Sequence, residues 1–305
     1  MMGPGITLML ALAGHTVTLY GRTAESLTRG VGAVDRSLEV LRGEDLVTTS
    51  AAAEARRRIN ASTDLAAAVG QATFVFESVA EDLELKQQLF AEVERLVAAD
   101  TILASNTSGL PITRIAERME RPERAATTHF WNPPHLMPLV EIVKGERTSD
   151  DTLARLRDVL ADAGKRVVVV RKDVPGQLGN RLLHALFREA FHMVQEGVAT
   201  IEDVDTALKY GPGLRFPAYG LLEHADMVGL DMMLSIDSYL FGALSNMTQP
   251  PEFVRELIAR GDLGAKTGRG LYDWTQRSAA DVLAARDAFL IDRLKERLEA
   301  DPSRD

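Results

Sequence analysis

Short apolar runs alternate with longer amphipathic stretches through the first half of the chain. The runs that predict strands cover residues 17–20, 74–77, 101–104, 126–130, 139–143 and 167–170. Helical periodicity occurs between them at residues 64–69, 83–98 and 151–163, and a short apolar helix over residues 6–13 precedes the first run. This alternation is typical of βαβ units and predicts a mostly parallel sheet with helices on its faces.

The pattern changes after the turn-rich segment 172–176, beyond which almost every periodic stretch is helical. A long helix is expected over residues 178–196, another begins after Thr200, a third after Pro250-Pro251, and a charged helix covers residues 279–300. We therefore expect a Rossmann-type α/β domain with a doubly wound sheet over residues 1–172. An all-α C-terminal domain follows over residues 173–305.

The amino-acid composition excludes several classes of site and function. The 305 residues are 46% hydrophobic and 26% charged, which is typical of a globular protein, and the formal charge of −9 argues against nucleic-acid binding. There is no cysteine, so disulfides, cysteine-ligated zinc and thiol nucleophiles are excluded. The chain also lacks the H-E-x-x-H pattern that would indicate a metal site. No apolar run reaches about 18 residues, and no basic segment precedes the first apolar helix. These features predict a cytoplasmic protein without a membrane span.

The N-terminus resembles part of a dinucleotide-binding turn. Gly3-Pro4-Gly5 stands at the start of the first helix, and a strand follows at residues 17–20. In the G-x-G-x-x-G motif the third glycine allows close packing of this helix on the first strand, and Gly3 is the candidate for that position. The first strand and the first two glycines are missing. Either the true start lies upstream, which we favour, or the chain is an inactive relative that binds its cofactor weakly.

The end of the strand at residues 17–20 bears on cofactor choice. A carboxylate there normally binds the ribose 2′-hydroxyl of NAD. This chain has Gly21 and Arg22 instead. Loss of the acid removes repulsion of a 2′-phosphate, so NADP remains an alternative to NAD.

Polar residues that suggest catalysis follow the later strands. Ser105 comes directly after the strand at residues 101–104, where a hydroxyl can bind a substrate oxygen. His129 ends one predicted strand and Glu141 lies within the next. An imidazole oriented by a carboxylate is a working general base. Asn180, near the start of the long helix, offers an amide to a ligand.

Five motifs in order resemble the L-3-hydroxyacyl-CoA dehydrogenase family. They are Ser105-Asn106-Thr107-Ser108, His129-Phe130-Trp131-Asn132-Pro133 with Val140-Glu141-Ile142-Val143, Pro175-Gly176 to Asn180-Arg181-Leu182-Leu183, Gly211-Pro212-Gly213 to Asp231, and Lys266 to Tyr272. Each motif alone is weakly specific, but together they cover nearly the whole chain. The resemblance implies oxidation of a 3-hydroxyacyl group by a nicotinamide cofactor, in fatty acid metabolism, by a homodimer joined through the helical domain.

The resemblance also implies individual roles. His129 is expected as the general base and Glu141 as its orienting acid, with Ser105 and Asn180 binding the substrate near the reacting carbon. Contacts with the nicotinamide cofactor are expected from Gly3, Glu81, Lys86, Ser105, Asn132 and Lys266.

Recognition of coenzyme A is less secure. Ser37 matches a position that contacts coenzyme A in the family, but the second contact, a lysine, appears as Glu44 here. A carboxylate repels phosphates. The substrate is therefore expected to be an acyl-CoA or, as an alternative, a free hydroxy acid or aldehyde.

Overall fold

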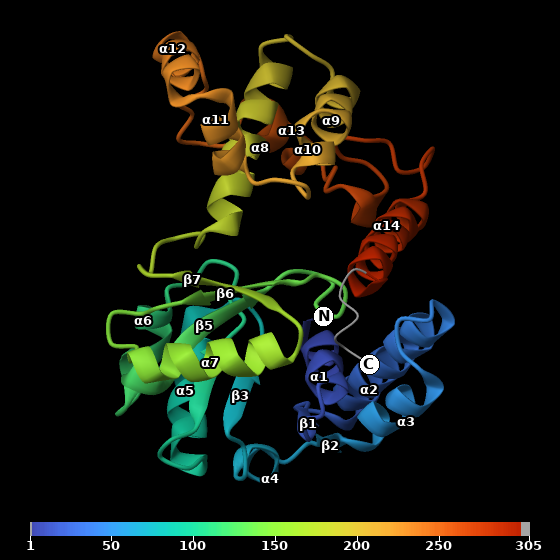
Figure 1. Ribbon diagram of the computed structural model, residues 1–305, viewed down its shortest axis with the longest axis vertical. Helices are drawn as coiled ribbons and strands as arrows, with labels where there is room; N and C mark the ends of the chain where they lie inside the picture. Colours follow the sequence, from blue (N-terminus) through green and yellow to red (C-terminus); the bar gives the residue numbers. More distant parts are fainter. Residues whose placement is uncertain (1, 300–305) are drawn as a thin grey trace. The chain divides into compact units, whose positions relative to one another are not determined.

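The computed structural model describes residues 2–299 and separates into two compact units. One unit contains the chain up to Arg181 together with the segment from Ala284 onward, and the other contains Leu182–Leu283. In the first unit lie α1 (Met2–Leu12), β1 (Val17–Tyr20), α2 (Ala24–Gly43), α3 (Thr49–Arg57), β2 (Ile59–Ser62), α4 (Leu65–Val69), β3 (Phe74–Glu77), α5 (Leu83–Leu96), β4 (Ile102–Ser105), α6 (Ile112–Ile115), the 3-10 turns η1 (Ala116–Arg118) and η2 (Pro122–Arg124), β5 (Ala125–Phe130), β6 (Leu139–Val143), α7 (Asp150–Asp162) and β7 (Arg166–Val170) (Figure 1).

The strands form two sheets. Five strands pair in the order β3-β4-β5-β6-β7, all parallel to their neighbours except β5 and β6, which are antiparallel. The strands β1 and β2 form a separate parallel pair. In a doubly wound sheet, the first strand of the fold lies between the strands that correspond to β1 and β3. The split therefore agrees with the expectation that this strand is missing from the sequence.

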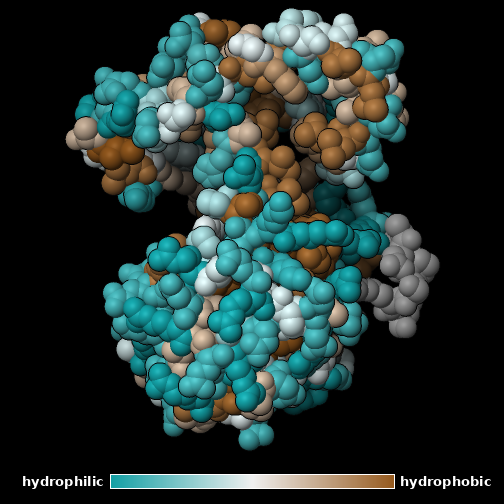
Figure 2. All heavy atoms as spheres, turned by 90° about the vertical axis from the view of Figure 1, so that its left-hand side faces the viewer, coloured by the Kyte–Doolittle hydropathy of each residue, from teal (hydrophilic) through white to brown (hydrophobic). Residues whose placement is uncertain are grey.

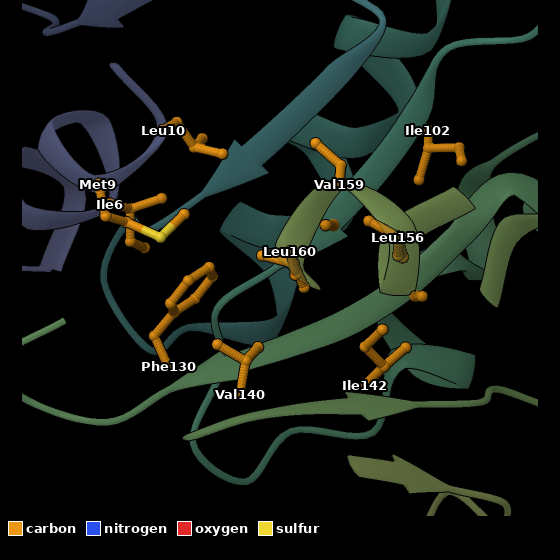
Figure 3. Close-up of a cluster of buried hydrophobic side chains, with 12 residues drawn as sticks. Ile6, Met9, Leu10, Ile102, Phe130, Val140, Ile142, Leu156, Val159 and Leu160 are labelled. Atoms are coloured by element: carbon orange, nitrogen blue, oxygen red, sulfur yellow. The ribbon is translucent and has the colours of Figure 1, made fainter. Parts of the chain in front are cut away.

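Helices cover both faces of the larger sheet. On one face α1 and α7 supply Ile6, Met9, Leu10, Leu156, Val159 and Leu160 to a cluster with strand residues such as Ile102 and Phe130 (Figure 3). On the other face α4, α5 and α6 pack on Leu103 and Ala125. Ile102 and Leu103 are neighbours in β4 and point to opposite faces because side chains alternate along a strand. This three-layer arrangement confirms the predicted α/β class.

Most predicted elements are present. The strands at residues 17–20, 74–77 and 139–143 have the expected bounds. Those expected at 126–130 and 167–170 begin one residue earlier, and the one expected at 101–104 is shifted by one residue to 102–105. The short strand β2 was not predicted, because its sequence Ile-Asn-Ala-Ser has a single large apolar residue.

The second unit is helical. It contains most of α8 (Gly179–Gln195), then α9 (Ile201–Tyr210), α10 (Pro212–Arg215), α11 (Leu221–Val228), α12 (Leu230–Leu240), α13 (Glu252–Ala259), the 3-10 turn η3 (Ala265–Thr267) and the start of α14 (Ala279–Glu299). Within the described chain, none of the residues of α8 to α13 is buried. Hydrophobic side chains lie at its surface, as Figure 2 shows.

The unit boundary differs from the expected division at residue 172. The chain passes into the helical unit only after Arg181, inside α8, and most of α14 belongs to the first unit. Ile291 of α14 is 5% exposed and packs with Leu38 and Leu41 of α2, while Lys295 Nζ donates to Glu44 Oε2 at 2.7 Å. The periodicity of residues 279–300 predicts a helix, but it does not predict that this helix packs against α2 of the first unit.

Lys165 fixes the loop between β5 and β6. Its side chain is nearly buried, and Nζ donates to the carbonyl oxygens of Pro134 and Met137 at 2.5 and 3.0 Å. Burial, with a smaller contribution from the charge of Arg297, lowers the pKa of Lys165 from 10.5 to about 8. Between those two pH values the unfolded chain keeps a proton that the folded chain has released, so folding stability rises with pH there.

We predict that this pH dependence is lost in Lys165→Met. Between pH 7.5 and 10, the unfolding free energy of the wild type should rise by about 1–3 kcal/mol relative to that of the variant. Urea unfolding at several pH values measures both curves. Parallel curves would show that Lys165 does not titrate in this range.

Candidate active site

A cavity of about 340 Å³ lies beyond the ends of β3, β4 and β5 in the first unit. Its walls come from residues that follow these strands, from the N-terminus of α1 and from the first turn of α8. They are Met2, Ser78, Val79, Glu81, Asn106, Ser108, His129, Phe130, Trp131, Asn132 and Asn180. Ligands of open α/β sheets bind at the carboxyl ends of the strands, so the position is that of a ligand site.

His129 and Glu141 form a buried pair at the edge of this cavity. They are register partners on the antiparallel strands β5 and β6, which places their side chains on the same face. His129 Nδ1 lies 2.7 Å from Glu141 Oε2. Because the carboxylate engages Nδ1, Nε2 is the nitrogen left to face a ligand. The predicted general base and its orienting acid are therefore brought together.

Glu141 is fully buried and holds three segments at once. Its Oε2 also accepts from Trp131 Nε1 at 3.2 Å, and its Oε1 accepts from the amides of Leu178 and Gly179 at 3.1 and 2.8 Å. Burial raises the pKa of Glu141. Hydrogen bonds from His129, Gly179 and Trp131 lower it further than burial raises it, so the net pKa lies below 4.5. The Glu141 carboxylate is ionised at neutral pH, and four hydrogen-bond donors stabilise its negative charge.

Gly179 allows this arrangement. A Cβ at this position would lie 2.5 Å from Trp131 Cζ2 and 3.3 Å from Glu141 Oε2. The start of α8 approaches the indole and the carboxylate this closely only because the residue has no side chain. The glycine of the motif Gly179-Asn180 is thus required by packing at the site.

Ser105 is placed differently from the expectation. It is fully buried, is not among the cavity-lining residues, and donates its hydroxyl to Glu77 Oε2 at 2.6 Å. Glu77 and Ser105 are register partners on β3 and β4. A serine has one O–H to donate, and here that donor is used inside the protein. The expected contacts of Ser105 with substrate and cofactor stay predictions.

Lys86 and Glu81 continue the same network. Lys86 Nζ donates to both oxygens of Glu77, at 2.7 and 3.0 Å, and lies 3.5 Å from Glu81 Oε2. Glu81 Oε1 accepts from Thr107 Oγ1 and from the amides of Ser108 and Gly109. Burial raises the pKa of Glu81, but these bonds and the charge of Lys86 lower it below its ordinary value. Glu81 lines the cavity, whereas Lys86 is buried behind it.

The remaining predicted residues fall into two groups. Asn132 and Asn180 line the cavity, and Asn180 Nδ2 donates to the carbonyl oxygen of Ser108 at 3.0 Å. Gly3 lies in the first turn of α1, next to the lining residue Met2, and a Cβ there would meet no atom within 4 Å. Ser37 lies on α2, and Lys266 is an exposed residue of η3 in the helical unit. Their predicted contacts with ligands stay predictions.

The cavity fits the nicotinamide end of a dinucleotide. It presents amides and a carboxylate from Asn132, Asn180 and Glu81, and the Ser78 hydroxyl on its wall is buried without a partner. The N-terminus of α1 reaches the cavity through Met2, and a helix N-terminus favours phosphate. Hydrogen-bonding groups and an anion-binding helix end are what the two halves of such a cofactor require.

Two family models match the chain. The 3-hydroxyacyl-CoA dehydrogenase NAD binding domain matches residues 1–174, and the 3-hydroxyacyl-CoA dehydrogenase C-terminal domain matches residues 176–274. The chain belongs to the 3-hydroxyacyl-CoA dehydrogenase family. It is an oxidoreductase, and its cofactor is NAD. The NADP alternative raised by Gly21 and Arg22 gains no support from these matches.

Members of this family with different substrates are about equally similar in sequence. A 5-formyl-3-hydroxy-2-methylpyridine 4-carboxylate 5-dehydrogenase of Mesorhizobium japonicum is 35% identical over 290 residues, covering 95% of this chain and 93% of the relative. The crystal structure of such a dehydrogenase, described as an NAD+ dependent dismutase, has a TM-score of 0.90 at 34% identity, covering 98% and 95%. The (S)-3-hydroxybutyryl-CoA dehydrogenase of Ralstonia eutropha has a TM-score of 0.74 at 35% identity, covering 89% and 95%.

Sequence reasoning missed several residues of the site. Glu77 was assigned only to a strand, although a glutamate at the end of an apolar run, followed by Lys86 on the next helix, indicates a buried pair. Asn106 lines the cavity, and its Oδ1 accepts from the amide of Phe130 at 2.9 Å. Trp131 was quoted within a motif but given no role.

Neither a metal-binding cluster nor a membrane-spanning helix is present in residues 2–299. Among these residues, no group of three or more histidine, aspartate or glutamate side chains is placed to hold a metal ion. No helix in the described part of the chain is long and apolar enough to span a membrane.

We predict that Glu141→Gln destabilises the protein in a pH-dependent way. The amide has only one oxygen and cannot accept from all four donors, so the unfolding free energy at pH 7 should fall by about 2–4 kcal/mol. Because the pKa of Glu141 is lowered by folding, its stabilisation is present above the unfolded pKa and is lost as pH falls through the folded one.

The difference between wild type and variant should therefore shrink at pH 4, as measured by urea unfolding at both pH values. Glu146→Gln, which removes an exposed carboxylate shortly after β6, is the matched control and should change stability little. A wild-type–variant difference that is the same at pH 7 and pH 4 would contradict the assigned role.

Proposed function

We propose that this protein catalyses reversible hydride transfer between NAD and a substrate carbon that carries a hydroxyl, with His129 as general base. The observation that carries the proposal is the buried His129–Glu141 pair, 2.7 Å apart, on the wall of the cavity. NAD, when bound, supplies the hydride acceptor. The chain supplies the proton acceptor and the groups that orient the reacting oxygen.

His129 takes the hydroxyl proton at Nε2. Glu141 accepts from Nδ1, which fixes the tautomer with Nε2 unprotonated and stabilises the imidazolium that forms. In the reverse direction the same imidazolium returns the proton to the carbonyl oxygen. Asn180 uses one N–H on Ser108 and has a second N–H to offer to the substrate oxygen.

For the substrate we propose a free hydroxy acid or aldehyde. Glu44, at the position where the resemblance places a lysine that contacts coenzyme A, accepts from Lys295 of α14. The apolar side of α14 packs beside it on α2 and buries Ile291. The likeness to a dehydrogenase of a pyridine carboxylate, at a TM-score of 0.90, supports the same class.

An acyl-CoA is the second candidate. Both family models are named for 3-hydroxyacyl-CoA dehydrogenase. Ser37, the other position that the resemblance links to coenzyme A, matches the family and lies half-buried on α2. A 3-hydroxyacyl-CoA and its 3-oxo form would then be the substrate and product, with the same role for His129.

The two candidates differ in a steady-state assay. We expect kcat/KM for acetoacetate, or for 5-formyl-3-hydroxy-2-methylpyridine-4-carboxylate, to exceed that for acetoacetyl-CoA by about tenfold or more. The lysine that the resemblance places against coenzyme A is Glu44 here, and Lys295 is engaged by that carboxylate. A lost charged hydrogen bond to a phosphate is worth about 1.5 kcal/mol or more. NADH absorbance follows the reaction.

His129→Gln tests the chemistry itself. This variant should lower turnover on every accepted substrate by on the order of 10² or more while NADH affinity changes little. Turnover close to the wild-type value would overturn the general base. A higher kcat/KM for acetoacetyl-CoA would instead establish the second candidate and leave the base in place.

We also propose that the helical unit joins two copies into a homodimer. Its exposed hydrophobic residues include Leu222, Met227 and Tyr239, which are 81%, 77% and 70% exposed, while none of the described residues of α8 to α13 is buried. A unit that buries so little apolar surface does not offset the entropy of its own folding. A second copy of the same face supplies the missing burial.

Sedimentation velocity at micromolar concentration tests the dimer. The wild type should sediment as a dimer, and Met227→Glu should sediment as a monomer with reduced helix content by circular dichroism. Val40→Glu, an equally drastic change at an exposed residue of α2, should remain dimeric. A monomeric wild type with full helix content would contradict the proposal.

A further inference from the structure

The cavity carries a surplus of negative charge. Among its lining residues Glu81 is a carboxylate, and none is a lysine or arginine. Behind the wall, Lys86 is the ammonium that faces both Glu77 and Glu81. Glu141 is a further buried carboxylate, and its partner His129 is neutral when it acts as a base.

Lys86 cannot neutralise both of its neighbours. It donates to both oxygens of Glu77, at 2.7 and 3.0 Å, but lies 3.5 Å from Glu81 Oε2. Glu77 also accepts from Ser105 and from the amide of Val79, so each of its oxygens has two donors. One net negative charge remains, and it lies on the side that faces the cavity.

Glu81 is held in place as that charge. Its Oε1 accepts from Thr107 Oγ1 at 2.5 Å and from two backbone amides at 3.1 and 3.2 Å. The pKa of Glu81 is lowered by these donors and by Lys86, so it is ionised at neutral pH. These bonds hold the carboxylate at the cavity wall.

The two redox forms of NAD differ in charge at one place. The nicotinamide ring is cationic when oxidised and neutral when reduced, while the ribose, pyrophosphate and adenine parts are the same. We infer that Glu81, with the uncompensated charge of its cluster, makes this site favour the oxidised over the reduced dinucleotide. This inference rests on the proposed function, since it requires the ring to occupy this cavity.

The consequence concerns reaction direction. Preferential binding of the oxidised cofactor lowers the energy of the complex that oxidises a hydroxyl, so the bound equilibrium moves toward that complex. The side chain of Glu81 is 45% exposed, so solvent screens its charge in part. A charge–charge attraction of this kind changes affinity by about threefold to tenfold.

The ratio of two dissociation constants tests the inference. Calorimetric titration with NAD+ and with NADH gives Kd(NAD+)/Kd(NADH), in which every contact common to both forms cancels. Glu81→Gln keeps an oxygen for Thr107, Ser108 and Gly109 and removes only the charge. We expect it to raise the ratio about threefold to tenfold.

Two further variants separate charge from structure. Glu81→Asp keeps the charge and should leave the ratio close to that of the wild type, even if both affinities fall. Glu94→Gln removes a carboxylate from the buried Arg124–Glu94 pair, whose residues do not line this cavity, and should also leave the ratio unchanged.

The possible failures are distinguishable. Equal weakening of both forms in Glu81→Gln would show a lost contact without a charge effect and would overturn the inference, as would an unchanged ratio. A wild type that binds neither nucleotide would instead overturn the proposed function, and this inference with it.

Discussion

The contact on which most of the first unit's site depends is the acceptance of four hydrogen bonds by the buried carboxylate of Glu141. Its donors come from β5, from the residue that follows β5, and from the two residues at the start of α8. A buried charge is tolerated only when its partners are all present. The orientation of His129 and the path of the chain into α8 are therefore set by the same interaction. Asn180, one residue beyond the last donor, reaches the cavity because of it.

A second carboxylate organises the cofactor side in the same way. Glu77 holds Ser105 across the β3–β4 pair and Lys86 from α5, as Glu141 holds His129 across the β5–β6 pair. In both cases strand register brings the partners together. The two sites differ in their partners: Glu141 is paired with an imidazole, whereas Glu77 is paired with the ammonium of Lys86, which lies farther from Glu81. Strand register thus determines which side chains lie next to each carboxylate, and the cationic partners available determine the net charge of each site.

The parts of this structure that were predictable from sequence are those with strong local signals. His129 and Glu141 could be paired because they lie in neighbouring predicted strands with Pro133 and Pro134 between them, whereas the antiparallel pairing of these strands was not predicted. Ser105 could be placed at a strand end, but the direction of its hydroxyl depends on Glu77 in a neighbouring strand, which has no local signature. The position of α14 was equally hidden, because an amphipathic helix does not specify which surface buries it. The separation of β1 and β2 from the five-stranded sheet is seen only in the structure, where no described strand lies between β1 and β3.

The helix α1 packs on both sheets of the first unit. One side of α1 packs through Ile6, Met9 and Leu10 on the cluster of the five-stranded sheet. Its other side packs through Leu8 and Ala11 on the cluster that contains Ile59 of β2. Among the described strands, β1 pairs with β2 alone and β3 with β4 alone, so side-chain packing on α1 is a contact that both sheets share. The same helix presents its N-terminus to the cavity. An anion bound at that N-terminus would therefore contact a helix that packs on both sheets, and any ligand that binds only the folded state stabilises it.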